Sequence, residues 1–308
     1  MVCRSELLLL NGMQFADKER ASQIVEEKYP DAVNTVFIEH GYDNLVAFVD
    51  EKYVLRFPRN EHAYRRDRYE KEILGQLTSL RGTEIPNILS EEFDPPYFVT
   101  EFISGKHLYA DEIRASSVDF QKNVGASIAK FAYALHTSLP FEVAKKIRGD
   151  FLMDALEEEP WEPYMEKMLL QTTLPTAVQD ALAKKYYQLW KAKALRPATV
   201  AIHDDLHMDN MLFENGQLTG VLDFADTGIG TPEQEFRQLY RINETVLQAA
   251  ISTYENCSGQ KLDIEIAKIW AIAQEMAGYS KELKDPTSKL YLRATSNLQQ
   301  WLPEWQSK

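Results

Sequence analysis

The chain has 308 residues, of which 44% are hydrophobic and 26% are charged, and this composition is typical of a globular protein with ample length for a buried core. The formal net charge of −13 argues against a nucleic-acid partner, because phosphate backbones are bound by basic surfaces. No apolar run approaches the ~20 residues of a membrane helix, so we expect no membrane association. The two cysteines fit neither a metal motif nor a disulfide framework, which indicates a reducing cytoplasm. Residues 1–12 carry no pattern, and Met13 is an alternative start.

The first third of the chain predicts one amphipathic helix and then a meander of short strands. Pro30 ends the first helix, and polar turns separate the strands. In chain order the expected elements are a helix over 16–29, strands over 36–38, 45–49 and 53–57, a helix over 61–80 and a strand over 97–102.

From about residue 118 the apolar period becomes helical. Val124, Ile128, Phe131 and Leu135 form one stripe of a long core helix that ends at His136. We expect His136 to pack or cap rather than to act in catalysis. The expected helices of this part cover 118–136, 176–194, 236–256, 262–283 and 287–302.

Residues 199–232 interrupt the helices with a strand, a polar loop, a hairpin and a second polar loop. Asp205 lies in the first loop, Asn210 follows five residues later, and Asp223 follows the hairpin. Asn215-Gly216 tolerates the positive φ angles of a tight hairpin turn. Because the hairpin folds the chain back on itself, we expect these three oxygen-bearing side chains to share one small volume.

This constellation suits phosphoryl transfer. The reaction needs hard cations on the nucleotide phosphates and one carboxylate that orients the attacking hydroxyl and accepts its proton. Mg²⁺ keeps several waters and needs few protein oxygens. We therefore assign Asp205 to the hydroxyl, and Asn210 and Asp223 to the metal, with two Mg²⁺ ions expected.

The whole signature resembles a known family. It consists of His-x-Asp at 203–205, Asn210, a hairpin, Asp223-Phe224 and Gly-Ile-Gly-x-Pro at 228–232. It is similar to the aminoglycoside phosphotransferases among the protein-kinase-like small-molecule kinases, and in motif it is nearest to the 2″-aminoglycoside phosphotransferases.

The resemblance implies an α+β, bilobal, protein-kinase-like fold. A small β-sheet lobe that binds nucleotide would span 1–102, and a larger, mostly helical lobe with the catalytic and substrate sites would span 103–308. ATP or GTP would be the co-substrate, and the sequence does not separate the two.

The third strand and the following helix carry the implied phosphate-binding cation and its partner. Arg56 stands where many members have Lys, and it keeps the charge with a different geometry. Glu70 matches the paired glutamate, with Glu72 as the alternative on a different helix face. Arg56 as a simple surface cation remains a second interpretation.

Two further nucleotide contacts are implied by the resemblance. The loop with Gly41 and Asn44 would lie over the phosphates, although a GxxN sequence is also an ordinary turn. The Glu101 carbonyl and the Ile103 amide would hydrogen-bond the base at the hinge.

The acceptor residues rest on the same comparison. The acidic, aromatic segment 151–166 would contact a cationic sugar, although a solvated acidic helix end is the competing interpretation, and Arg241 stands where the 2″ branch is acidic. The candidate substrate residues are Asp154, Glu158, Trp161, Glu244 and Glu275.

Two departures from the family pattern, at Asp204 and Glu235, and the nearby Asp226 bear on the loop. Asp204, beside Asp205, would raise its neighbour's proton affinity if the two carboxylates came close. Glu235 stands where most relatives have Asp, one methylene shorter. Asp226 would be structural or a distant neighbour of the metal.

The predicted function is transfer of the γ-phosphoryl group of ATP or GTP to a hydroxyl of a small molecule, in first place an aminoglycoside antibiotic, which would confer resistance. One alternative is a kinase of the same fold for a macrolide, a choline-like alcohol or a metabolite sugar. The other is a catalytically silent pseudokinase that serves as a binding module. We expect a monomer and a cationic acceptor.

Overall fold

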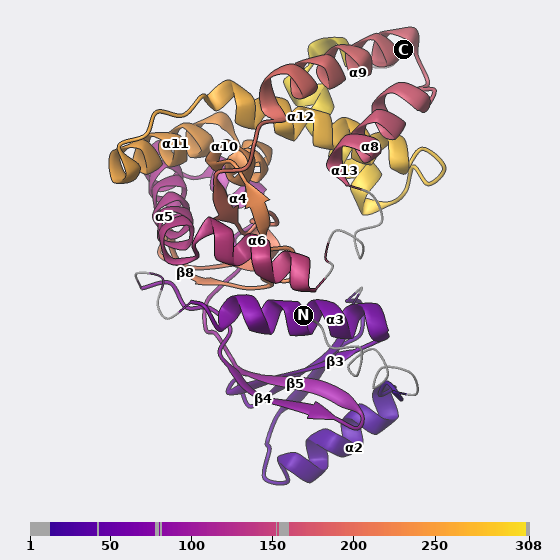
Figure 1. The fold of residues 1–308 in the computed structure, drawn as a ribbon, viewed down its shortest axis with the longest axis vertical. Helices are drawn as coiled ribbons and strands as arrows, with labels where there is room; N and C mark the ends of the chain where they lie inside the picture. Colours follow the sequence, from indigo (N-terminus) through magenta and orange to yellow (C-terminus); the bar gives the residue numbers. More distant parts are fainter. Residues whose placement is uncertain are drawn as a thin grey trace.

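The computed structural model describes residues 13–41, 43–77, 80, 82–151, 153 and 160–305. It has an α+β bilobal architecture, with a sheet-containing small lobe below a mostly helical large lobe in Figure 1. No helix within the described ranges is both long and apolar enough to cross a bilayer.

The small lobe is built on a five-stranded antiparallel sheet in the order β1-β2-β3-β5-β4. One face of the sheet packs against α2 (Lys18–Lys28), while α3 lies on the side toward the large lobe (Figure 1). Alternation explains this, since Leu45, Ala47 and Val49 of β2 are buried on the α2 side. The strands are β1 (Thr35–Ile38), β2 (Asn44–Val49), β3 (Tyr53–Pro58), β4 (Ile88–Phe93) and β5 (Pro96–Glu101).

The predicted helix over 61–80 is shorter than expected. Helix α3 is Glu61–Leu74, begins at the N-cap Asn60 and ends at Gly75. Leu77 and Leu80 are nevertheless buried, because the chain beyond the helix turns back into the large lobe's core. The sequence pattern also missed β4, whose two glutamates disfavour a strand assignment.

Helices make up most of the large lobe. The long helix α5 (Val118–Ser138) packs along α11 (Glu244–Ser258), and a Cβ at Gly125 would lie 2.3 Å from the Val246 carbonyl oxygen. The other helices are α4 (Ala110–Ala115), α6 (Phe141–Asp150), α8 (Trp161–Glu166), α9 (Ala177–Leu189), α10 (Pro232–Glu235), α12 (Ile264–Lys281) and α13 (Lys289–Trp301). Of these, α4 and α6 were not predicted from the sequence. Short π or 3-10 turns cover Lys167–Gln171, Trp190–Ala194, Met208–Asn210, Phe236–Arg241 and Pro303–Trp305.

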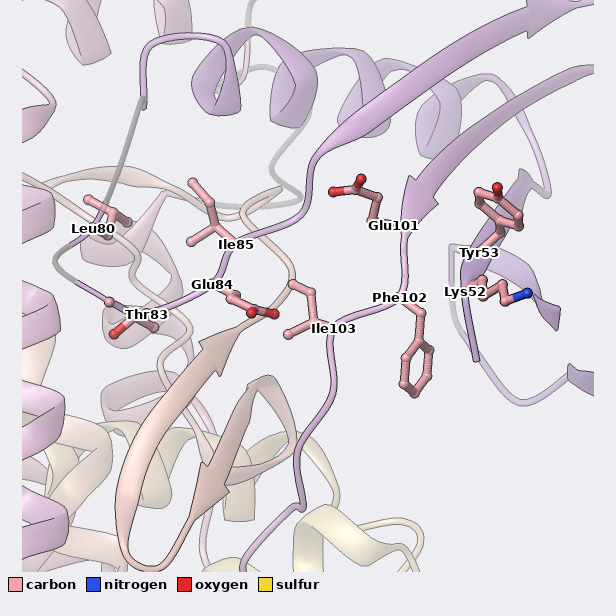
Figure 2. Close-up of a pocket in the computed structure, with 10 residues that line it drawn as sticks. Lys52, Tyr53, Leu80, Thr83, Glu84, Ile85, Glu101, Phe102 and Ile103 are labelled. Carbon is pink, nitrogen blue, oxygen red and sulfur yellow. The ribbon is translucent and has the colours of Figure 1, made fainter. Parts of the chain in front are cut away.

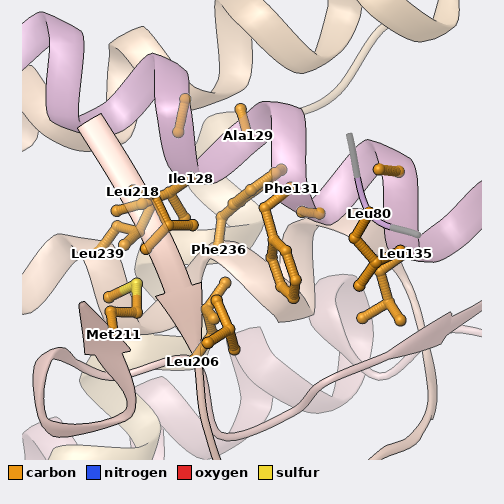
Figure 3. Close-up of a cluster of buried hydrophobic side chains, with 14 of the residues drawn as sticks. Leu80, Ile128, Ala129, Phe131, Leu135, Leu206, Met211, Leu218, Phe236 and Leu239 are labelled. Atoms are coloured by element: carbon orange, nitrogen blue, oxygen red, sulfur yellow. The ribbon is translucent and has the colours of Figure 1, made fainter. Parts of the chain in front are cut away.

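Two short sheets carry the polar loops of the large lobe. Strand β6 (Val200–Ile202) pairs with β9 (Gly228–Gly230), and β7 (Met211–Glu214) pairs with β8 (Gln217–Val221). Figure 3 shows α5 side chains, including Phe131, packed toward Leu206 and Met211 beneath these loops. The main hydrophobic core therefore supports the segment that the sequence singled out.

Candidate active site

Asp205 lies in the loop that follows β6. Its carboxylate is 3.2 Å from Nε2 of His207 and keeps 30% of its side-chain surface accessible. Burial pushes the pKa of Asp205 upward, but His207, with smaller contributions from His203 and Arg237, outweighs burial and lowers the pKa to about 2. The side chain is therefore an anion throughout the physiological range.

Asp204 does not act on Asp205 as its position in the sequence suggested. Its backbone has a positive φ of 64°, and its carboxylate lies 2.6 Å from Nη1 of Arg237 and accepts a hydrogen bond from Gln234 at 3.0 Å. The neighbouring charge is thus neutralised by a buried guanidinium.

Glu235 binds the backbone of the loop that carries Asp204 and Asp205. Its carboxylate accepts the backbone N–H of His203 at 2.7 Å and that of Asp204 at 3.2 Å, and it contacts Nε2 of His136 at 3.3 Å. His136 is buried and its Nδ1 lies 2.8 Å from the Tyr254 hydroxyl, as expected for a packed residue. The longer Glu thus still reaches the loop.

The 3-10 turn Met208–Asn210 brings Asn210 back to Asp205, and the β7–β8 hairpin then returns the chain to Asn210. Nδ2 of Asn210 donates to the backbone oxygen of Asp205 at 3.0 Å and to its Oδ2 at 3.2 Å. These bonds fix the orientation of the amide and leave Oδ1 as its acceptor atom. Asn215 and Gly216 have φ of 50° and 75°, as the Asn-Gly turn predicted. Across the hairpin, the Leu222 N–H donates to the backbone carbonyl oxygen of Asn210 at 2.9 Å.

Asp223 comes two residues after the end of β8, and its backbone has a positive φ of 60°. Its carboxylate keeps accessible surface, yet the surrounding protein displaces enough water to raise its pKa to about 6, and Glu70 and Asp226 add to the rise. A bound cation would relieve this crowding of negative charge.

One amide oxygen and one carboxylate, together with phosphate oxygens and water, fit the donor set that Mg²⁺ prefers. Within the described residues no group of three or more His, Cys, Asp or Glu forms a metal site. The residues present therefore fit a nucleotide-bound Mg²⁺ rather than a metal held by protein alone.

Arg56 of β3 is an internal cation rather than a surface one. It forms an ion pair with Glu70 of α3 and lies 3.2 Å from Asp67, and 15% of its side-chain surface is accessible. Glu70 also accepts the Phe224 N–H at 2.9 Å, which links α3 to the residue after Asp223. Glu72, the alternative partner, is exposed.

Asp67 was missed by the sequence argument. It is 2% exposed, lies three residues before Glu70 on the same helix face, and accepts a hydrogen bond from Asn44 at 3.1 Å. Burial raises its pKa to about 7, with Arg56 opposing and Glu70 adding to the rise. The i, i+3 spacing was the available signal.

The loop before β2 lies beside these residues. A Cβ at Gly41 would lie 2.6 Å from the Asn44 carbonyl oxygen, so only glycine fits this backbone. Arg66 of α3 contacts Asp43 at 3.0 Å and Asp226 at 2.8 Å. It thereby connects the loop of the small lobe to the segment that follows Asp223 in the large lobe.

The chain passes between the lobes after β5. A cavity of about 810 Å³ opens there, and Glu101 and Ile103 line it. Figure 2 shows Phe102 and Ile103 continuing from β5, alongside the segment 83–85. The Phe102 N–H is engaged by the Lys52 oxygen at 2.8 Å.

A second pocket, of about 530 Å³, opens beside Asp205. Trp161, a candidate substrate residue, lines it, and Asp154 and Glu158 fall outside the described residues. Glu244 and Glu275 do not line it. Glu244 is paired with Lys268 at 2.7 Å on the surface.

Glu275 is fully buried and paired with Arg241. The expectation that Glu244 and Glu275 face the substrate is therefore corrected. Arg241 itself lines the pocket instead.

Comparisons with known proteins bear on the family and the fold of the chain. The model of the phosphotransferase enzyme family matches residues 34–258. No curated protein matches the chain.

Solved structures share the fold at low identity. The GDP complex of wild-type aminoglycoside 2'-phosphotransferase-IIIa is 16% identical with a TM-score of 0.74, covering 92% of this chain and 98% of that one. The streptomycin–ATP–APH(2")-IIa ternary complex is 18% identical (TM-score 0.63; 94% and 97% covered). The apoenzyme of macrolide 2'-phosphotransferase MphH from Brachybacterium faecium is 17% identical (TM-score 0.64; 90% and 97% covered).

Proposed function

The chain belongs to the phosphotransferase enzyme family, and from that premise we propose that it transfers the γ-phosphoryl group of ATP or GTP to a hydroxyl of a small molecule. One observation carries the proposal. The Asp205 carboxylate lines a pocket of about 530 Å³ and at the same time accepts a hydrogen bond from Asn210, whose remaining oxygen suits Mg²⁺.

Asp205 orients the acceptor hydroxyl and accepts its proton. Asn210 and Asp223 hold Mg²⁺, two ions in this proposal. When bound, the metal neutralises charge that develops on the transferring phosphoryl group. The hydrogen bond between the Asn210 amide and the Asp205 carboxylate holds the proposed base and the proposed metal ligand at a fixed distance from each other.

The nucleotide occupies the space between a small lobe of residues 1–102 and a large lobe of residues 103–308. Arg56, fixed by Glu70, contacts the phosphates, and the loop with Gly41 and Asn44 covers them. The Glu101 carbonyl and the Ile103 N–H bind the base, and the engagement of the Phe102 N–H by Lys52 supports this choice of hinge groups.

The acceptor is the finer question. The sequence motif favours an aminoglycoside, and similar structures are complexes with GDP, with streptomycin and ATP, or of a macrolide 2'-phosphotransferase. Two of the candidate acids do not support a cationic acceptor, because Glu244 lies outside the pocket and Glu275 pairs with Arg241. Asp154 and Glu158 lie outside the described residues. A macrolide, an alcohol or a metabolite sugar remains an alternative within the same reaction.

The test replaces the proposed base. Asp205→Asn should lower acceptor-dependent nucleotide turnover by a factor of about 10²–10⁴, the usual contribution of a positioned base, while far-UV circular dichroism and the nucleotide Kd stay unchanged. Asp209→Asn is the matched control, since that carboxylate is 81% exposed in the same loop.

Two outcomes would contradict the proposal. Retention of full turnover by Asp205→Asn would exclude Asp205 as the base. Nucleotide binding with no turnover for the unaltered protein, across aminoglycosides, macrolides, alcohols and sugars, would favour the binding-module alternative.

A further inference from the structure

The pocket beside Asp205 has a lining that is richer in basic than in acidic residues, and we call its basic side chains the basic wall. Four of the pocket's five cations come from three separate segments, namely the 3-10 turn 236–241, the end of α12 and α13. The basic residues that line the pocket are Lys167, Arg237, Arg241, Lys281 and Arg293, against the acids Asp204, Asp205 and Asp226.

The acids of the pocket do not neutralise this wall. Asp204 is held by Arg237 at 2.6 Å, and Asp226 by Arg66 at 2.8 Å, outside the lining. Asp205 is the proposed base, held by His207. Among the described residues, the acids of the lining therefore pair with groups other than Arg241, Lys281 and Arg293.

Arg241 and Arg293 share one carboxylate. Both contact Oε1 of the fully buried Glu275, Arg293 at 3.5 Å. Lys281 forms no ion pair with any residue that the structure describes. Arg241 and Arg293 thus share a single anion, and Lys281 adds a further positive charge to the lining of the same pocket.

The charge of this wall also acts on Arg241. Burial lowers the pKa of Arg241 to about 10. Glu275 opposes this shift, while Arg293 and Arg237 contribute to it. An anion placed among these groups would be stabilised by them, whereas a polyamine would be repelled.

We propose that the acceptor carries an anionic group, a carboxylate or a phosphate, beside the hydroxyl that is phosphorylated, and that Arg293, Lys281 and Arg241 bind it. Guanidinium groups match both oxyanions through paired N–H donors. Trp161 and Tyr164 line the same pocket and offer ring faces to the carbon skeleton. This inference rests on the proposed function and names its substrate class.

The first experiment compares matched acceptors in a coupled nucleotide-turnover assay. Each pair has the same hydroxyl skeleton without and with an anion, as in ribose and ribose 5-phosphate, glucose and glucose 6-phosphate, or glycerol and glycerate. Kanamycin is the cationic arm. We expect the anionic member to have the higher kcat/KM, with carboxylate and phosphate distinguished by which pair responds.

Variants then connect the preference to the wall. Lys281→Glu should raise the KM for the anionic acceptor about tenfold or more by reversing a charge in the pocket, and Lys281→Arg should retain most of the affinity. Lys284→Glu, an exposed lysine outside the lining, is the matched control. A KM that Lys281→Glu leaves unchanged would overturn the proposal.

A binding measurement tests the anion site independently of turnover. With the nucleotide site filled by ADP and Mg²⁺, potassium phosphate should raise the Tm of the unaltered protein more than potassium chloride does at equal ionic strength. The increase should shrink in Lys281→Glu and Arg293→Gln, and remain in Lys284→Glu. Equal increases in all four proteins would contradict an anion site.

The two proposals fail in different ways. Preferred phosphorylation of kanamycin or of a neutral acceptor would overturn the anionic acceptor and leave the kinase intact. If the unaltered protein turned over no acceptor, while phosphate binding still depended on Lys281, the proposed kinase activity would be wrong and the anion site would stand.

Discussion

Arg56 has two carboxylate partners, and this distinguishes the site at the scale of single residues. A guanidinium offers five N–H donors in a planar fork, whereas an ammonium is a compact point charge. Glu70 and Asp67, three residues apart on α3, use that fork from one side. Both contacts use Nη2, and among the described residues Nε of Arg56 is a buried donor without a hydrogen-bond partner.

The raised pKa of Asp67 predicts a pH-dependent stability. Because its pKa rises from 3.8 to about 7 on folding, the folded protein binds the extra proton between these values and loses stability as the pH rises through them. Asp67→Asn removes that loss. Relative to the unaltered protein, the variant should gain about 2 kcal/mol in free energy of unfolding between pH 5 and pH 8, measured by urea denaturation.

The control for this prediction lies on the same helix. Glu72→Gln changes an exposed carboxyl, so its free energy of unfolding should follow that of the unaltered protein across the same pH range. A difference for Asp67→Asn that is constant with pH would show that Asp67 is ionised in the folded protein throughout.

At the scale of elements, the β7–β8 hairpin positions two of the three proposed reactive groups. Its register pairs Met211 with Val221 and Glu214 with Gln217, which places Asn210 and Asp223 just beyond its open end. The turn packs against α5, since a Cβ at Gly216 would lie 2.7 Å from the Phe120 ring. The hairpin conformation and the first turn of α5 therefore constrain each other.

Gly216→Ala should destabilise the protein by about 1–3 kcal/mol, because the positive φ of 75° strains an alanine and the added methyl group meets Phe120. Turnover should fall as well, since the hairpin places Asn210 and Asp223. Gly149→Ala is the control: it lies inside α6 with open space around its Cβ position, so it should be neutral or stabilise by up to about 1 kcal/mol. Thermal denaturation measures both, and equal Tm values would contradict the strain.

The elements themselves were predictable where the local pattern was strong. The apolar stripe of α5 and the Asn-Gly turn gave the right structure, because each depends on neighbouring residues only. The predicted end of α3 was wrong because Leu77 and Leu80 continue the apolar pattern although they lie beyond the last residue of the helix. β4 escaped prediction because its polar residues are stabilised by pairing with β5.

At the scale of the whole molecule, α3 joins the two lobes. It contacts the segment after Asp223 at three successive points: Glu70 binds the Phe224 N–H, Arg66 pairs with Asp226, and the Tyr69 hydroxyl donates to the Thr227 oxygen. A helix of the small lobe thus holds the backbone of the proposed metal ligand.

Arg66→Ala should loosen this connection. A partly exposed ion pair contributes about 1 kcal/mol, so a smaller fraction of molecules would hold the lobes closed and the KM for nucleotide should rise about fivefold. Small-angle X-ray scattering should give a larger radius of gyration for the nucleotide-free variant, which Mg²⁺ and nucleotide should reduce again.

Arg68→Ala serves as the comparison, because the Arg68 contact with Glu91, at 3.6 Å, lies within the small lobe. If both variants, or neither, changed the radius of gyration, the Arg66 contacts would not be what holds the lobes together.

By itself the sequence indicated the family and, through that resemblance, the bilobal fold. It also predicted the β7–β8 hairpin that places Asn210 and Asp223 at its open end, because the turn and both strands are neighbours in the chain. The pairing of Arg56 with Glu70 was implied by the resemblance to the family, and the structure contains that ion pair. Only the tertiary structure showed that Asp67 contacts Arg56 and that Glu275 is buried in an ion pair with Arg241. It also showed that basic residues of the 3-10 turn 236–241, α12 and α13 line one pocket. Those neighbours depend on how separate helices rotate and pack against one another, and no local pattern contains that information.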